Sequence, residues 1–310
     1  MNYSNVKGHI EKGAPLSKMS WLNVGGPADI LFKPFDKIDL QKFLKEIDKS
    51  LPVFVLGACS NLIIRDGGIE GICIKLGKNF REISINDDKT VSVGAASLSS
   101  HLAIESARSG IDLTFLRTIP GTIGGAVSMN AGCYGKYIKD VFISGEFISR
   151  DGELITLNNR ELEFSYRKSN IPSGWIMTAA NFKADIKERE VLVLEMNKMI
   201  ESRNRTQPRG VLSCGSAFRN PSGAASSGCS NESNERKAWK MIDDAGLRGF
   251  KIGSAQVSSK HSNFLINTGD ASSAQFEELG ERIIQAVFEQ SGVRLEWEIK
   301  LIGNKLSREL

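Results

Sequence analysis

The sequence has few histidines and no paired cysteines. Its 310 residues include only three histidines, and none of its five cysteines belongs to a Cys-x-x-Cys pair. Because the cysteine count is odd and the spacing irregular, the pattern argues against a disulfide framework and against a zinc site. We therefore expect reduced cysteines and no bound metal.

Long apolar runs and a strong charge of either sign are also absent. No stretch approaches the roughly 20 apolar residues that a membrane-spanning helix needs, and residues 1–18 show neither an apolar run nor a cleavage-site pattern. The net charge of +4, from 40 basic and 36 acidic residues, is too small to indicate nucleic-acid binding. We expect a soluble, cytoplasmic protein that binds neither membrane nor nucleic acid.

Glycine, by contrast, is abundant, with 30 residues that cluster between predicted strands and helices. Alternation of strand, helix and glycine turn, in a chain long enough for two domains, indicates an α/β or α+β fold. The elements predicted in the first part of the chain are a helix over 36–49, strands over 51–56, 62–65, 71–76 and 90–94, and a helix over 97–109 with Ser97 or Ser99 as N-cap.

The second half has a clearer pattern. Strands over 142–148 and 154–157 flank Asp151-Gly152, which is typical of a hairpin turn. Residues 221–237 are of low complexity, and we expect 222–235 to form a mobile, dispensable loop. Strict alternation predicts a strand over 293–302. Helices are predicted over 191–205, over 237–245 with Gly246 just beyond its end, and over 274–290.

One segment is rich enough in glycine to suggest a ligand. Residues 117–135 contain five glycines and a proline, and small residues let backbone N–H groups converge on an anion such as a pyrophosphate. A loop that only makes turns explains the composition equally well. No G-x-G-x-x-G fingerprint follows a predicted strand, which disfavours a Rossmann dinucleotide site.

Three other candidates carry weaker signals. Ser216, after a glycine, presents a hydroxyl to a ligand or caps an ordinary turn, and the lack of G-x-S-x-G disfavours a hydrolase. Arg167 lies in a polar run where a solvated side chain is the usual outcome. Glu298 lies on the polar face of the predicted last strand, where exposure is the simpler explanation.

Taken in order, these segments resemble the UDP-N-acetylenolpyruvoylglucosamine reductases, the MurB family. The likeness covers nearly the whole chain, from 21–28 to 295–303. No single segment is specific, but six in the same order between those ends are. They are residues 57–66, 119–135, 165–169, 215–221, 238–246 and 253–267.

The resemblance implies a fold, a cofactor and a reaction. It implies an FAD-binding region of the vanillyl-alcohol-oxidase type over 1–190, with subdomains 1–76 and 77–190. It also implies a substrate domain over 191–310, the last strand of which returns to the active site. NADPH is the implied reductant, a UDP-sugar enolpyruvyl ether the substrate, and a monomer the expected state. The implied contacts of non-covalent FAD are Gly57, Ala58, Cys59, Ser60, Asn61, Ile119, Pro120, Gly121, Thr122, Gly124, Gly125, Ala126, Asn130, Ala131 and Gly132.

The resemblance also assigns catalytic roles. Ser216 matches the proton donor, in Gly-Ser-x-Phe-Arg-Asn-Pro. Arg167 matches the residue that neutralises negative charge on the substrate carboxylate, for which a guanidinium is geometrically suited. Glu298, in Leu-Glu-x-Glu, matches a hydrogen-bonding partner of the same group. The matched positions near the substrate are Tyr166, Arg219 and Asn220.

Three departures and two rival functions accompany this interpretation. Cys59 and Ser254 stand where the family usually has glycine, and the loop over 222–235 is longer than the family leads us to expect. No inserted tyrosine-bearing loop follows Ser169, which indicates the subtype without it. An oxidase of the same flavin fold, which often tethers FAD through histidine, is one rival. A non-catalytic nucleotide-binding scaffold is the other, and the presence of all three catalytic candidates argues against it.

Overall fold

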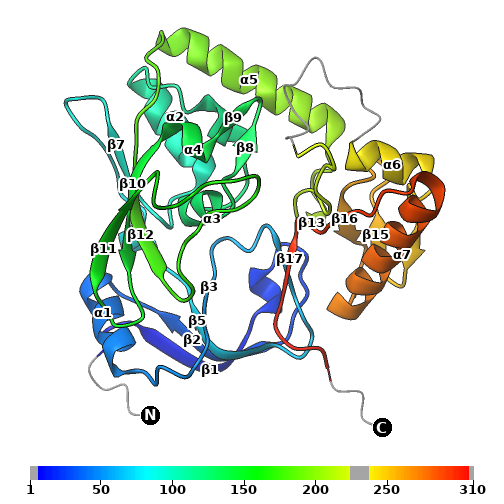
Figure 1. Ribbon diagram of the computed structural model, residues 1–310, viewed down its shortest axis with the longest axis horizontal. Helices are drawn as coiled ribbons and strands as arrows, with labels where there is room; N and C mark the ends of the chain where they lie inside the picture. Colours follow the sequence, from blue (N-terminus) through cyan, green and yellow to red (C-terminus); the bar gives the residue numbers. More distant parts are fainter. Residues whose placement is uncertain (1–5, 224–236, 307–310) are drawn as a thin grey trace. The chain divides into compact units, whose positions relative to one another are not determined.

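The computed structural model describes residues 6–223 and 237–306, and these form two compact units. Within the described residues, the first unit draws on 6–13, Asp29–Ala58 and Gly71–Ile200, and the second on Ala14–Ala28, Cys59–Glu70, 201–223 and 237–306 (Figure 1). Two N-terminal segments thus group with the C-terminal part of the chain. Most of the loop expected at 222–235 lies outside the described residues.

The first sheet of the first unit is covered by α1 (Lys37–Glu46). The helix begins where Asp36 caps it, its Oδ1 accepting the Asp39 N–H at 2.8 Å, and it ends three residues before the predicted limit. Phe32 of the sheet and Phe43 of the helix stack with ring centroids 3.9 Å apart. The strand order is β1 (His9–Pro15), β2 (Pro27–Lys33), β5 (Ile69–Ile74) and β3 (Val53–Val55).

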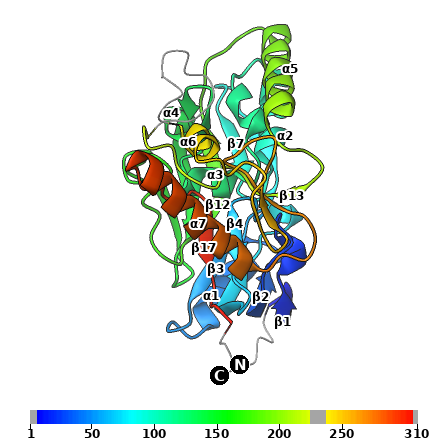
Figure 2. The same ribbon diagram turned by 90° about the vertical axis from the view of Figure 1, so that its right-hand side faces the viewer.

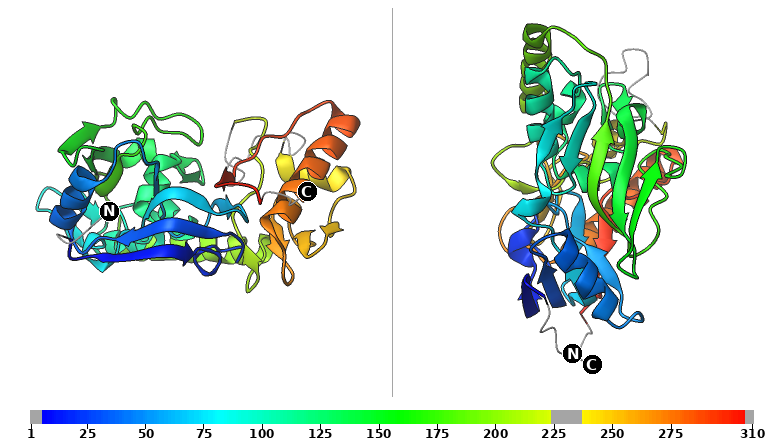
Figure 3. Two further views of the ribbon diagram at one scale, coloured as in Figure 1. Left: turned by 90° about the horizontal axis from the view of Figure 1, so that it is seen from below. Right: turned by 90° about the vertical axis from the view of Figure 1, so that its left-hand side faces the viewer.

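The second sheet of this unit is antiparallel and has five strands, visible in the right-hand view of Figure 3. The predicted hairpin is confirmed, with Ile148 paired to Leu154 and Gly152 at φ 74°. The order is β11 (Leu154–Asn158), β10 (Phe142–Ile148), β12 (Ile176–Phe182), β7 (Val91–Gly94) and β6 (Ile83–Ile85).

Helix α2 (Ser99–Arg108) packs against the core of this unit through Leu102, Ala103 and Ala107. Leu98, which is 39% exposed, is the N-cap residue. No side chain caps the helix, so the prediction of a serine cap was wrong. The remaining elements of the unit are η2 (Lys78–Phe80), η3 (Thr114–Thr118), α3 (Ile123–Ser128), β8 (Gly132–Cys133), β9 (Lys136–Tyr137), α4 (Ile138–Val141) and the first part of α5 (Arg189–Thr206).

The second unit pairs a four-stranded sheet with α7 (Ser273–Ser291) and α6 (Ala238–Asp244), which lie beside each other in Figure 2. Gly246 and Gly292 follow the two helices at φ 70° and 71°, so the terminal glycine predicted at 246 is confirmed. Gly280 of α7 leaves room for the Trp297 ring, which a Cβ would strike. The sheet order is β13 (Leu212–Ser213), β16 (Leu265–Asn267), β15 (Ala255–Val257) and β14 (Lys251–Ile252).

The last strand is much shorter than its alternating pattern predicts. Only β17 (Lys300–Ile302) is a strand, and it pairs in parallel with β4 (Leu62–Ile64). Leu295 and Ile299 are buried, so the alternation itself is confirmed. The ladder is broken because Trp297 bridges Phe218 instead. None of the described helices is long and apolar enough to cross a membrane.

A buried ion cluster in the first unit makes stability depend on pH. The Asp112 carboxylate, 2% exposed, accepts hydrogen bonds from Lys136 and Lys187, both at 2.8 Å, and from Thr114 Oγ1 at 2.6 Å. Burial raises the pKa of Asp112, but these three hydrogen bonds outweigh it and hold the pKa well below its ordinary value. The folded pKa therefore lies below the unfolded value of about 3.9.

Replacing Asp112 with asparagine should therefore destabilise the fold at neutral pH by about 3 kcal/mol, since two lysines lose their counter-charge. The carboxylate stabilises fully above about pH 5, and this contribution fades as the pH falls below about 4. Urea unfolding of both proteins from pH 7 to pH 3 should show the difference shrinking with acid. Asp185→Asn is the matched control, because Asp185 is 81% exposed and lies 3.8 Å from Lys136. A difference at pH 3 as large as that at pH 7 would contradict this account.

Candidate functional site

Two of the predicted cofactor-binding turns touch within the first unit. A Cβ on Gly57 would lie 2.7 Å from Thr122 Oγ1, so only glycine fits this approach without movement. The Gly57 carbonyl accepts a hydrogen bond from Lys75 Nζ at 2.7 Å. Gly57 and Ala58 are thus held beside the glycine-rich loop, although the loop lies far from them in the sequence, at residues 117–135.

The glycine-rich loop turns at Gly121, which has φ 108°, and enters α3 at Thr122. Thr122 Oγ1 accepts the Gly125 N–H at 3.4 Å. Neither Gly121 nor Thr122 donates its own N–H to another of the described residues. A Cβ on Gly124 would lie 3.3 Å from that of Ala95. Small residues and free N–H donors at one turn fit an anionic group such as the pyrophosphate of FAD.

The side chain of Asn130, another predicted FAD contact, joins two segments of the protein. The side chain is buried; its Nδ2 donates to the Ser165 carbonyl at 2.9 Å and its Oδ1 accepts the Lys139 N–H at 3.0 Å. It therefore ties the glycine-rich loop to the turn that carries Arg167. The other predicted contacts in this stretch are Ile119, Pro120, Ala126, Ala131 and Gly132, of which Ala126 and Gly132 are buried.

Arg167 lies at the tip of a two-residue turn in the first unit. Ser165 and Lys168 exchange backbone hydrogen bonds at 3.0 and 3.2 Å. Arg167 has φ 56°, uncommon outside glycine, and its guanidinium carbon is 5.1 Å from the Tyr166 ring centroid. A half-buried arginine held by a left-handed backbone and an aromatic ring is more constrained than the solvated side chain that the polar run predicted.

The rest of the first cofactor turn belongs to the second unit, where it contacts both predicted catalytic segments. The Ser60 carbonyl accepts the Gly215 N–H at 3.3 Å, next to Ser216. Asn61 Nδ2 donates to the Glu298 carbonyl at 3.0 Å. The structure thus brings Ser60 and Asn61, predicted to bind FAD, against the backbone of the residues predicted to act on the substrate.

Ser216 and Glu298 lie close along two paired segments. The Glu298 N–H donates to the Ala217 carbonyl at 2.8 Å, and the Arg219 N–H donates to the Glu296 carbonyl at 2.8 Å. Ser216 and Glu298 both keep partly exposed side chains, whereas Ala217 between them is buried. Asn220, predicted to contact substrate, is buried, and its Oδ1 accepts the Ala238 N–H at 3.1 Å at the start of α6.

Charged side chains of both signs lie along these two segments. Arg219 Nε is buried and has no hydrogen-bond partner among the described residues, and its Nη1 lies 3.6 Å from Glu296. Burial and the charge of Arg219 lower the pKa of Lys300. Lys300 itself is exposed, as expected for the polar face of the last strand.

The two departures from the family glycines have different outcomes. Cys59 is buried and adopts φ 54°, a left-handed backbone that explains why glycine is usual at this position. A non-glycine residue in this conformation costs about 1 kcal/mol of backbone strain. Ser254 is not among the residues with positive φ. Its carbonyl accepts the Thr268 N–H at 2.9 Å. Serine therefore fits at 254 without backbone strain.

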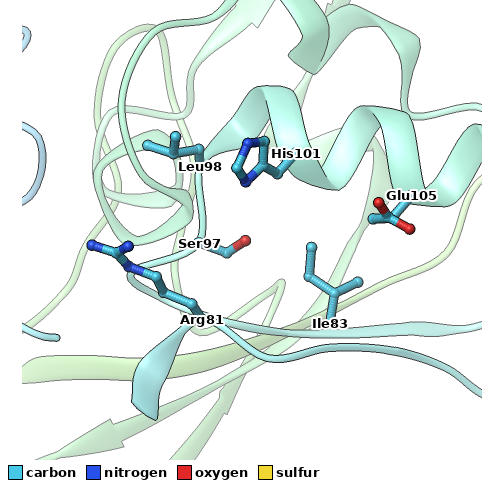
Figure 4. A pocket seen from close by; sticks show the side chains of 6 residues that line it. All are labelled: Arg81, Ile83, Ser97, Leu98, His101 and Glu105. Carbon is cyan, nitrogen blue, oxygen red and sulfur yellow. The ribbon is translucent and has the colours of Figure 1, made fainter. Parts of the chain in front are cut away.

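A separate pocket of about 320 Å³ lies in the first unit (Figure 4). His101 and Glu105 lie one turn apart on α2, with Arg81 across from them. None of the lining residues is a predicted site residue, so the pocket is not the predicted FAD contact surface. The lining residues are Arg81, Ile83, Ser97, Leu98, His101 and Glu105.

Comparison with known proteins decides the family. Residues 207–302 match the C-terminal domain of UDP-N-acetylenolpyruvoylglucosamine reductase, and residues 28–158 match an FAD binding domain. The reductase of Cereibacter sphaeroides is 48% identical over 97% of both chains, and that of Ruegeria pomeroyi is 48% identical over 98% of both. The chain belongs to the family of UDP-N-acetylenolpyruvoylglucosamine reductases.

A solved structure supports the same assignment. The crystal structure of the family member from Thermus caldophilus has a TM-score of 0.79 and 31% identity, covering 96% of this chain and 99% of that one. The α+β fold with an FAD-binding region is thereby confirmed. Like other UDP-N-acetylenolpyruvoylglucosamine reductases, the protein is an FAD-dependent oxidoreductase.

Proposed function

We propose that this reductase uses NADPH to convert UDP-N-acetylglucosamine enolpyruvate to UDP-N-acetylmuramate, in the cytoplasmic synthesis of peptidoglycan precursors. The near full-length identity with curated reductases carries the proposal. The contact of Ser60 and Asn61 with the Ser216 and Glu298 segments supports it, because predicted cofactor and catalytic residues share one framework.

We propose that FAD is held chiefly by residues 1–190 and the substrate chiefly by 191–310. When bound, FAD supplies a hydride acceptor for NADPH and a hydride donor for the enolpyruvyl group. The turn at Gly121 and Thr122 would hold its pyrophosphate through backbone N–H groups.

The protein side chains would stabilise negative charge on the substrate and donate a proton to it. Negative charge develops on the substrate carboxylate as the double bond is reduced. Arg167, held in place by its turn and by Tyr166, would neutralise it in bidentate geometry. Glu298 would hydrogen-bond the same group. Ser216 would give its hydroxyl proton to the carbon next to the carboxylate, and the Arg219 guanidinium suits the anionic nucleotide.

The protein should purify yellow and release FAD intact on denaturation, because the Gly57 and Gly121 turns fit a pyrophosphate and no covalent tether is expected. Absorbance of the purified protein and of the denatured supernatant measures this. Colourless protein that takes up no FAD on titration would contradict the cofactor assignment. Flavin that stays on the denatured chain would favour the oxidase rival.

A further inference from the structure

The segment that follows Ser216 has a partner on each side. On one side it pairs with the residues around Glu298, as described above, and the rings of Phe218 and Trp297 lie 4.8 Å apart between centroids. On the other side none of the described strands runs alongside it. A single residue, Asn263, takes the place of that strand.

Asn263 makes three hydrogen bonds to the two residues after Ser216. Its carbonyl accepts the Ala217 N–H at 2.8 Å, its Oδ1 accepts the Phe218 N–H at 2.9 Å, and its Nδ2 donates to the Phe218 carbonyl at 2.9 Å. Asn263 is 2% exposed, Phe218 1% and Ala217 0%. Because water cannot replace these bonds, losing one leaves a buried backbone group unpaired.

Asn263 is itself fixed by a neutral histidine. Its N–H donates to His261 Nδ1 at 3.3 Å, and the His261 ring packs edge-on against Phe264 with centroids 4.8 Å apart. Burial and the charge of Arg248 lower the pKa of His261 to about 4. The ring therefore stays neutral and able to accept above about pH 5.

We infer that Asn263 is a positioning residue, which sets where Ser216 stands relative to Glu298. Ala217 links the two: its N–H is held by Asn263, its carbonyl holds the Glu298 N–H, and Ser216 is bonded to it directly. A shift of the segment would change the position of the Ser216 hydroxyl relative to the Glu298 side chain. This inference rests on the proposed function, and it concerns the half-reaction in which the enolpyruvyl substrate reoxidises the flavin.

The test is Asn263→Asp, assayed by stopped flow from pH 8 to pH 5.5. An ionised carboxylate can accept the Phe218 N–H but cannot donate to the Phe218 carbonyl, whereas a protonated carboxyl does both. Flavin reduction by NADPH should match the wild type. Reoxidation should be slowed by about 10²-fold at pH 8, the cost of about 1 Å of misplacement, and the ratio to wild type should shrink toward pH 5.5.

Other ionisable groups surround this segment, which is why each rate is divided by the wild-type rate at the same pH. They are Arg219 on the segment itself, Glu296 and Glu298 on the paired segment, and His261, Asp243 and Arg248 near Asn263. The matched control is Asn267→Asp. Asn267 is a buried asparagine of the same unit that likewise donates to a carbonyl, of Leu22 at 2.8 Å, and accepts from the Gly269 N–H at 3.0 Å.

The control should lose as much thermal stability as Asn263→Asp but keep reoxidation within a few-fold of wild type at every pH. Equal slowing of both half-reactions, a ratio that does not change with pH, or the same loss in Asn267→Asp would overturn the inference. If Asn263→Asp fails to fold at pH 8, Asn263→Gln carries the test: it keeps the carboxamide one methylene further out, and the same asymmetry between half-reactions is expected. A wild type that never reoxidises with this substrate would instead refute the proposed function.

Discussion

Replacing Ser216 with alanine should leave reduction of the flavin by NADPH unchanged and slow its reoxidation by the enolpyruvyl substrate ~10²–10⁴-fold. That range is typical of a lost general acid. The substitution removes only the hydroxyl, because the backbone bonds of Ala217 and Phe218 hold the segment in place. Stopped-flow absorbance separates the two half-reactions.

Ser213→Ala is the matched control for this experiment. Ser213 lies three residues before Ser216. Its hydroxyl donates to the Leu265 carbonyl at 2.8 Å and has no proposed chemical role. Both half-reactions of this control should stay close to wild type. If Ser216→Ala slowed both half-reactions equally, the serine would be structural and another residue would have to supply the proton.

Glu298→Gln should show the same asymmetry, with reoxidation slowed by about 10²–10³-fold, the cost of losing one stabilising group at developing charge. The fold should be preserved, because Glu298 is held through its backbone, by Ala217 and by Asn61. Measurement of the unfolding midpoint checks that premise, and stopped flow measures the rates.

Glu296→Gln provides the comparison within the same motif. Glu296 is 76% exposed and lies 3.6 Å from Arg219, a surface ion pair of small energetic value. Its removal should change either rate by less than a few-fold. An equally slow reoxidation in Glu296→Gln would mean that general loss of negative charge, rather than the position of Glu298, causes the effect.

Local chemistry explains where sequence-based prediction of the fold succeeded. Asp151-Gly152 suits a tight turn, and Gly246 and Gly292 adopt the left-handed backbone that ends a helix. The strand predicted over 293–302 was too long. Alternation of apolar and polar residues indicates which side chains are buried, whereas a strand also needs a continuous hydrogen-bonding partner. Here β4 pairs only with Lys300–Ile302.

Long-range contacts explain what could not be predicted about the site. The resemblance pointed to Ser216, Arg167 and Glu298, but no local pattern shows that Asn61 bonds the Glu298 carbonyl or that Asn130 bonds that of Ser165. Asn263 lies far from Ser216 in the sequence. Neither its residue type nor its spacing from the other site residues marks it as part of the site. Only the folded structure shows its bonds to Phe218.

The most direct test of the proposed reaction is an anaerobic single turnover. Purified holoenzyme is bleached with one equivalent of NADPH and then mixed with UDP-N-acetylglucosamine enolpyruvate. The oxidised flavin spectrum should return without oxygen, with formation of an equal amount of UDP-N-acetylmuramate. If the flavin stays reduced until air is admitted, the protein does not reduce this substrate and the proposed function is wrong.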